Sequence, residues 1–121
     1  YIIYLQCINK KKQNIYCMEK VIRDGKVAVL ISHGYGAGWY SWHSKQELLF
    51  HPKIVELVEQ NRKNEITEKL CQELLGTDEY VCVLGVDGLS VHWLPIGTAF
   101  EVDEYDGAES LRTIADLVLV A

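Results

Sequence analysis

Three Asp-Gly pairs separate apolar runs of the sequence, and they constrain the fold more than any other feature. They are Asp24-Gly25, Asp87-Gly88 and Asp106-Gly107. Asp-Gly tolerates the positive φ angles of a type I′ turn, which makes it the strongest short-range signal for a β-hairpin. The first pair stands between residues 20–23 and the apolar run 27–32, so it predicts a short strand followed by a buried one.

The second pair has the most regular surroundings, because the apolar segments 80–86 and 89–94 flank it. A two-residue turn at Asp87-Gly88 places Cys82 opposite Trp93 and gives the two segments one wholly apolar face. Pattern and register agree, and we predict a hairpin at this position.

Two helices are predicted between these strands. Pro52 suits a first helical turn, and an apolar stripe follows it at helical spacing. Asn64 is the expected cap of the second helix, and Gly76 is its expected stop.

Beyond the hairpin, residues 98–105 predict another strand. Residues 114–121 predict a final strand, with a helix from Glu109 onward as the alternative. Strands, then helices, then strands joined by tight turns indicate the α+β class. We predict a mostly antiparallel sheet of about five strands with two helices packed on one face.

The first seventeen residues differ in composition from the rest. Twelve of them are Tyr, Ile, Asn or Lys, which A/T-rich codons specify, and the first Met is Met18. We expect residues 1–17 to be an over-extended reading frame or a disordered leader, and 18–121 to form a single globular domain. A genuine N-terminal strand or helix is the alternative. The apolar run precedes the lysines, which is the reverse of a secretory signal.

Acidic side chains dominate the C-terminal part. Residues 77–121 contain nine acids and one base, Arg112, a balance that disfavours direct nucleic-acid binding. A possible acidic patch comprises Glu101, Asp103, Glu104, Asp106 and Glu109. We expect it to be a solvated strand edge, since the EF-hand pattern is missing. The four cysteines show no paired spacing, which favours a reduced, cytosolic protein.

The segment 32–43, SHGYGAGWYSWH, is the most unusual in composition. Glycine lets a backbone approach a ligand closely, and Trp and Tyr are favoured at recognition sites. Its spacing G-x-G-x-G matches no dinucleotide or phosphate loop. The predicted ligand- or partner-binding residues are Tyr35, Gly36, Gly38, Trp39, Tyr40, Trp42 and His43. The alternative is that the glycines form a bend and the aromatic rings cover one end of the core.

The sequence contains no catalytic constellation, so it favours a binding module over an enzyme. The four histidines lack HExxH or any other short ligand spacing, and we expect no metal and no cofactor. A small cation-dependent hydrolase that uses His33 or His43 with Asp103 or Asp106 is kept as an alternative.

Residues 27–42 (VAVLISHGYGAGWYSW), 48–58 (LLFHPKIVELV) and 92–110 (HWLPIGTAFEVDEYDGAES) resemble a family of small uncharacterised proteins encoded by bacteriophages and prophages. The resemblance implies a phage-borne accessory protein in the bacterial cytoplasm and gives no activity. We therefore expect a module that contacts a host protein or a small ligand, with no membrane association. The other alternative is an acidic mimic of nucleic acid that inhibits a host or defence protein.

Overall fold

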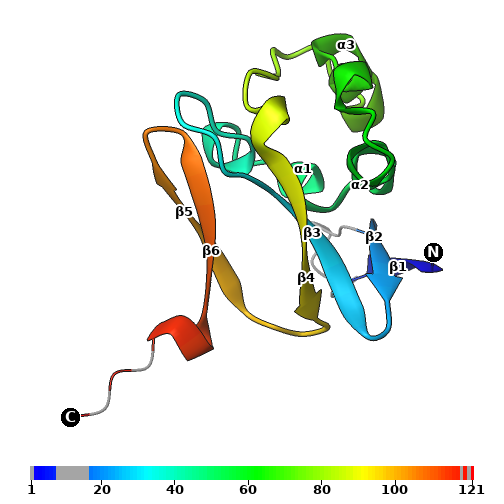
Figure 1. Cartoon of the computed structure of the whole chain (residues 1–121). Helices are drawn as coiled ribbons and strands as arrows, with labels where there is room; N and C mark the ends of the chain where they lie inside the picture. Colours follow the sequence, from blue (N-terminus) through cyan, green and yellow to red (C-terminus); the bar gives the residue numbers. More distant parts are fainter. Residues whose placement is uncertain (1, 8–16, 118, 120) are drawn as a thin grey trace.

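The computed structural model describes residues 2–7, 17–117, 119 and 121 of the chain. The fold is α+β with antiparallel sheets, which confirms the predicted class (Figure 1). The expectation of a single sheet is wrong in detail, because the C-terminal hairpin forms a second sheet of its own. Within the described residues, no helix is long and apolar enough to cross a membrane.

The larger sheet has its strands in sequence order, each antiparallel to its neighbour. They are β1 (Ile2–Cys7), β2 (Cys17–Arg23), β3 (Lys26–Ser32) and β4 (Leu89–Pro95). The predicted turn at Asp24-Gly25 joins β2 to β3, and its two residues have φ angles of 53° and 76°. These angles are the ones that an Asp-Gly pair supplies at little steric cost.

Strand β1 falls within the predicted leader. It pairs with β2 from Ile2↔Ile22 to Cys7↔Cys17, so residues 2–7 form the N-terminal strand that the sequence left as an alternative. Residues 8–16 lie outside the described residues.

The prediction of a hairpin around Asp87-Gly88 is wrong. Residues 81–83 have no regular structure, Val86–Gly88 form one turn of 3-10 helix, and neither Asp87 nor Gly88 has a positive φ. β4 instead pairs with all seven residues of β3. The preceding segment bonds to distant side chains: the Ser32 hydroxyl donates to the Gly85 carbonyl oxygen at 2.7 Å.

The second sheet consists of β5 (Phe100–Tyr105) and β6 (Ala108–Thr113), joined by the two-residue turn Asp106-Gly107. The strand predicted over 114–121 is wrong, because β6 ends at Thr113 and Ile114–Leu117 form a 3-10 turn. The alternative helix from Glu109 is also wrong. Both φ angles of the Asp106-Gly107 turn are positive, and the turn sends the chain directly back along β5.

Three short α-helices lie between β3 and β4: α1 (Glu47–Phe50), α2 (Pro52–Glu59) and α3 (Glu68–Leu75). The predicted start at Pro52 and stop at Gly76 are confirmed, with Gly76 at φ 67°. The predicted cap at Asn64 is wrong. The Thr67 side chain accepts the Leu70 N–H at 3.1 Å, while Asn64 lies in a separate 3-10 turn.

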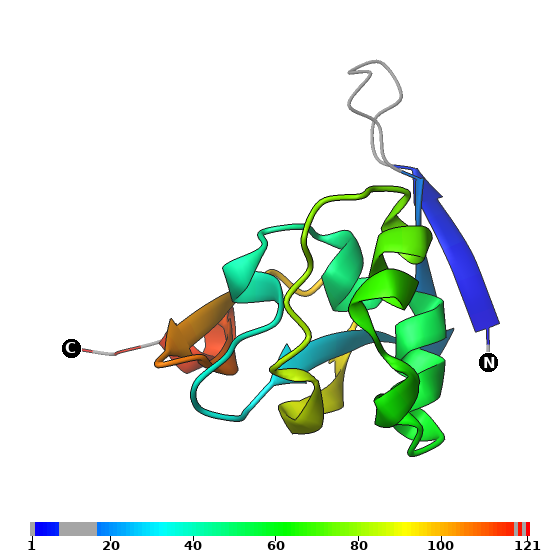
Figure 2. The same ribbon diagram turned by 90° about the horizontal axis from the view of Figure 1, so that it is seen from above.

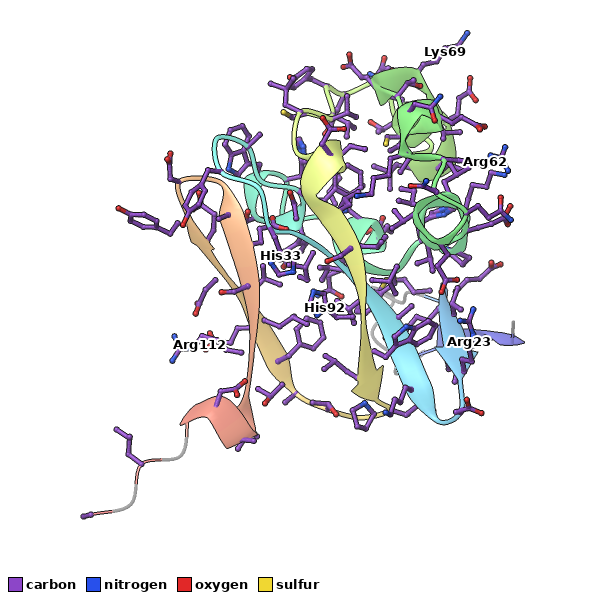
Figure 3. The ribbon with its side chains drawn as sticks, viewed as in Figure 1. Arg23, His33, Arg62, Lys69, His92 and Arg112 are labelled. Carbon is purple, nitrogen blue, oxygen red and sulfur yellow. The ribbon has the colours of Figure 1, made fainter. Side chains whose placement is uncertain are left out.

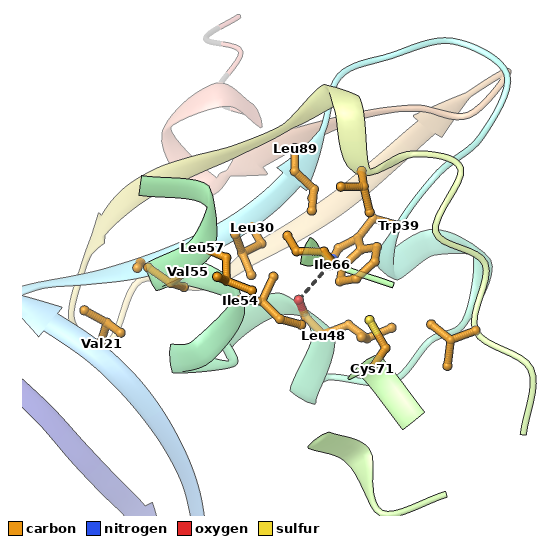
Figure 4. Packing of buried hydrophobic residues seen from close by; sticks show 13 residues of the cluster. Val21, Leu30, Trp39, Leu48, Ile54, Val55, Leu57, Ile66, Cys71 and Leu89 are labelled. Atoms are coloured by element: carbon orange, nitrogen blue, oxygen red, sulfur yellow. Dashed lines mark hydrogen bonds between the residues drawn. The ribbon is translucent and has the colours of Figure 1, made fainter. Parts of the chain in front are cut away.

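Strand β3 separates two apolar layers, because successive side chains of a strand point to opposite faces. Ala28 and Leu30 pack with residues of the helices, as Figure 4 shows for Leu30. Val29 and Ile31 pack on the other face with Phe100 and other residues of the β5–β6 hairpin. In Figure 2 the hairpin and helices α2 and α3 accordingly lie on opposite sides of the molecule.

Candidate functional site

The glycine-rich segment after β3 lies in direct backbone contact with two other parts of the chain. His33 N donates to the Gly88 carbonyl oxygen at 2.9 Å, and Gly36 N donates to the Asp106 carbonyl oxygen at 2.6 Å. A Cβ atom on Gly85 would lie 2.6 Å from the carbonyl oxygen of Gly38. The loop is therefore held between the chain before β4 and the β5–β6 turn.

Glu109 from β6 joins this loop to β3. It is 2% exposed, so the expectation that it belongs to a solvated acidic edge is wrong. One carboxylate oxygen accepts Ser32 N–H at 3.0 Å. The other accepts Trp39 N–H at 2.7 Å and, from Ser41, both the N–H at 2.8 Å and the hydroxyl at 2.6 Å. A buried carboxylate is stable only with such partners, and this one fixes the loop to the hairpin.

Trp39 is a core residue, and its prediction as a surface anchor is wrong. It is fully buried, and its indole N–H donates to the Leu48 carbonyl oxygen at 2.7 Å (Figure 4). The ring packs against the helical layer with Ile54 and Ile66. For this residue the alternative, an aromatic ring that closes one end of the core, is confirmed.

The other predicted loop residues differ in exposure. Tyr35 is 75% exposed and Trp42 is 46% exposed, whereas Tyr40 is half-buried against both apolar layers. His43 is engaged within the protein, because its Nε2 accepts the Cys82 N–H at 3.0 Å. Gly36, at φ 96°, supplies a left-handed bend.

The acidic residues do not form one group. Asp103 forms an ion pair with Arg112 at 3.0 Å, and a Glu104 carboxylate oxygen accepts Gly107 N–H at 2.6 Å. Glu101 and Asp106 are exposed. Among the described residues, no hydrogen bond or ion pair connects these acids to a histidine, and no group of three or more His, Cys, Asp or Glu is arranged to hold a metal ion.

The space between the two sheets forms a groove. It has a volume of about 550 Å³ and lies between β2, α1 and β5. Its lining includes Met18, Lys20, Tyr40, Phe50, Phe100 and Val102. A smaller hollow of about 200 Å³ adjoins it and shares Lys20, Phe50 and Phe100. The combined space falls in the range of about 300–1,000 Å³ that is usual for small-molecule sites.

Aromatic rings and one cation give the groove its chemical character. Phe50 and Phe100, which both line the groove, meet edge to face with ring centroids 6.3 Å apart. The Lys20 ammonium group lies 4.3 Å from the centroid of the Phe50 ring. Partial burial lowers the pKa of Lys20. Glu101 also borders the groove, but it alternates with the inward-facing Phe100 and so belongs to the outer face of β5.

Among the residues that line the groove, the sequence singled out as candidate site residues only Tyr40, in the loop, and Glu101, in the acidic patch. The groove's residues lie on β2, α1 and β5, which are far apart in the sequence, and each looks like an ordinary core or surface residue. Phe100 and Val102 share one face of β5, but their spacing alone does not show which neighbour that face meets.

No family model, no curated protein and no solved structure matches this chain.

Proposed function

We propose that this protein is a non-enzymatic binding module whose ligand site is the groove between the two sheets. The observation that carries the proposal is a groove of small-molecule size with aromatic walls and one lysine ammonium group at its side. The predicted setting, a phage or prophage accessory protein in the bacterial cytoplasm, is part of the same proposal.

The chemistry of the walls defines the ligand class. Phe50, Phe100 and Tyr40 offer flat apolar surface, which favours an aromatic or otherwise apolar body. Lys20 offers a positive charge in a partly desolvated position, where an ionic hydrogen bond is stronger than in water. The ligand that fits both is a small aromatic anion, such as a carboxylate, sulfonate or phosphate ester.

Fluorescence titration with anilinonaphthalene sulfonate, an aromatic anion, tests the proposal on the full chain. We expect saturable binding of one molecule per chain. Lys20→Met keeps the apolar stem over Phe50 and removes the charge, so it should weaken binding about tenfold, equivalent to about 1.4 kcal/mol. Phe100→Ala should weaken it further.

Two control variants distinguish binding in the groove from binding elsewhere on the protein. Lys69→Gln removes an exposed charge on α3, far from the groove, and should leave the affinity unchanged (Figure 3). The double variant Tyr35→Ala, Trp42→Ala removes the exposed rings of the loop. If that double variant abolishes binding while Lys20→Met does not, the ligand site is the loop and the groove proposal is wrong.

The two alternatives from the sequence have less support. An acidic mimic of nucleic acid would use Asp103, Glu104 and Asp106, yet Asp103 is paired with Arg112. A cation-dependent hydrolase would use His33 or His43 with Asp103 or Asp106, yet within the described part of the chain no hydrogen bond or ion pair joins either histidine to either acid. Neither arrangement offers a site comparable to the groove.

A further inference from the structure

Two histidines that are far apart in the sequence face each other at one edge of the larger sheet. His33 follows the end of β3, and His92 lies within β4 (Figure 3). Their Nε2 atoms are 2.7 Å apart, their ring centroids are 4.9 Å apart, and the ring planes are inclined by 59°. His33 is exposed and His92 is half-buried, so water reaches the point where the two nitrogens converge.

The short separation restricts the protonation of the pair. Two imidazolium rings at this distance would repel each other, and two N–H groups cannot point at one another. At least one Nε2 therefore presents a lone pair toward the other ring. Neutral imidazole is the form that binds metal ions.

The backbone holds both rings in place. β3 and β4 are paired along their full length, with Val29 opposite His92. His33 N donates to the Gly88 carbonyl oxygen at 2.9 Å, which extends the ladder by one residue. The two Cα positions are therefore fixed by the sheet, and only rotation of the side chains is needed to change the distance between the Nε2 atoms.

We propose that His33 and His92 form an open two-histidine site for a divalent transition-metal ion. Imidazole suits Zn²⁺, Ni²⁺ and Cu²⁺, whereas Mg²⁺ and Ca²⁺ require oxygen ligands. Two nitrogens at about 2.0–2.1 Å from a tetrahedral ion lie about 3.3 Å apart. The rings must separate by about 0.6 Å from their present 2.7 Å, a small rotation for the exposed His33. Water or an exogenous ligand completes the coordination.

The donor set defines what such an ion can do. Two protein ligands leave at least two positions of a four-coordinate ion open, unlike a closed structural zinc site. The Ser90 hydroxyl lies 3.3 Å from His92 Nε2 and is placed to hydrogen-bond a water on the ion. The site lies on the β3–β4 ladder rather than in the groove, so this inference does not depend on the proposed function.

Titration of the full chain with Ni²⁺, followed by isothermal calorimetry, tests the proposal. We expect one Ni²⁺ per chain to bind at this pair, and His33→Gln and His92→Gln each to weaken that binding by at least about tenfold, the lower end of what even outer-shell changes cost. His51→Asn is the matched control: it removes a histidine elsewhere and keeps a residue that can cap α2. Circular dichroism should show all three variants folded.

Cu²⁺ electron paramagnetic resonance provides a second, structural measurement. The wild-type spectrum should show coupling to two imidazole nitrogens, and either single variant should show coupling to one. The proposal is overturned if the wild-type chain binds no Ni²⁺ at this pair, because the histidines are then only hydrogen-bonded. It is equally overturned if His33→Gln and His92→Gln bind Ni²⁺ as the wild type does.

Discussion

Replacing Glu109 by Gln tests whether one buried carboxylate holds the loop, β3 and the hairpin together. The glutamate accepts four hydrogen bonds at 2.6–3.0 Å from Ser32, Trp39 and Ser41. Gln has the same shape but only one acceptor oxygen. If that oxygen keeps the three bonds to Trp39 and Ser41, the new NH₂ group faces the Ser32 N–H, and two donors then point at each other.

The expected magnitude follows from these four contacts. The unsatisfied Ser32 N–H costs about 1–3 kcal/mol, and three bonds to a neutral rather than a charged acceptor lose about 1 kcal/mol each. The lower desolvation cost of the amide offsets part of this. We expect Glu109→Gln to lower the free energy of unfolding by about 3 kcal/mol, a large share of the roughly 5–15 kcal/mol typical of a domain.

Urea denaturation followed by tryptophan fluorescence measures this loss, since the buried Trp39 reports on unfolding. Glu101→Gln is the matched control: it removes the same charge from an exposed position on the same hairpin, and its effect should stay within about 0.5 kcal/mol. If Glu109→Gln is no more destabilising than Glu101→Gln, the carboxylate does not organise the loop and the reasoning is wrong.

Three further predictions follow from single contacts. Gly107→Ala should destabilise the protein by several kcal/mol more than Gly25→Ala, as measured by thermal unfolding. Both glycines have a positive φ, but only a Cβ at position 107 would overlap the Ala37 backbone. Equal losses of stability in the two variants would refute this close approach between Gly107 and Ala37. Burial lowers the pKa of His51, so the unfolded chain binds more protons than the folded one as the pH falls below about 6.5, and stability should fall there. His51 Nδ1 accepts the Lys53 N–H, and Asn can keep this cap without titrating. The loss of stability at low pH should therefore be smaller in His51→Asn. An unchanged loss would contradict the assignment of this pH dependence to His51. Burial raises the pKa of Cys71 to about 11, so iodoacetamide at pH 8 should label Cys71 far more slowly in the folded protein than in urea. Peptide mass spectrometry measures the two labelling rates, and equal rates would contradict the burial of the Cys71 thiol.

The Asp-Gly pairs show how far local sequence determines this fold. Asp24-Gly25 and Asp106-Gly107 adopt the positive φ angles that the pair favours, and each joins two neighbouring strands. Asp87-Gly88 does not, although its flanking pattern was the most regular. There β4 pairs with β3 instead. The paired residues are more than fifty positions apart in the sequence, so the local pattern around Asp87-Gly88 cannot predict this pairing.

The segment before Asp87 explains the difference in physical terms. Cys82 N–H donates to His43 Nε2, and the Ser32 hydroxyl donates to the Gly85 carbonyl oxygen, so side chains satisfy the backbone that a strand would have paired. Val81 and Cys82 are both buried, although alternation along a strand would place them on opposite faces. Val81 and Cys82 are therefore buried in the core although they do not form a strand.

The candidate site was predicted only in part, because exposure cannot be read from residue type. Trp39 and Trp42 are three residues apart in a segment of uniform composition, yet one is fully buried and the other is 46% exposed. The Trp39 N–H donates to the Glu109 carboxylate, 70 positions away, and the indole N–H donates to the Leu48 carbonyl oxygen, contacts that residue type does not reveal. Lys20 and Phe100 gave no sequence signal, since their importance arises only where two sheets meet.

The loop and the groove are connected through the β5–β6 hairpin. Glu109 on β6 fixes the hairpin to the loop, while Phe100 and Val102 on β5 form one wall of the groove. Loosening the hairpin should therefore widen the groove and weaken binding of the aromatic anion, even though Glu109 is not among the residues that line it.

Three variants distinguish a loop that positions the groove from a loop that binds the ligand. If the loop positions it, Glu109→Gln should weaken probe binding under conditions where the protein is still folded, whereas the Tyr35→Ala, Trp42→Ala double variant should not. If the loop itself binds, the double variant should weaken binding more than Lys20→Met does. The order of the three affinities separates the two models, because the exposed rings lie in the loop itself, whereas the buried Glu109 carboxylate reaches the loop from β6.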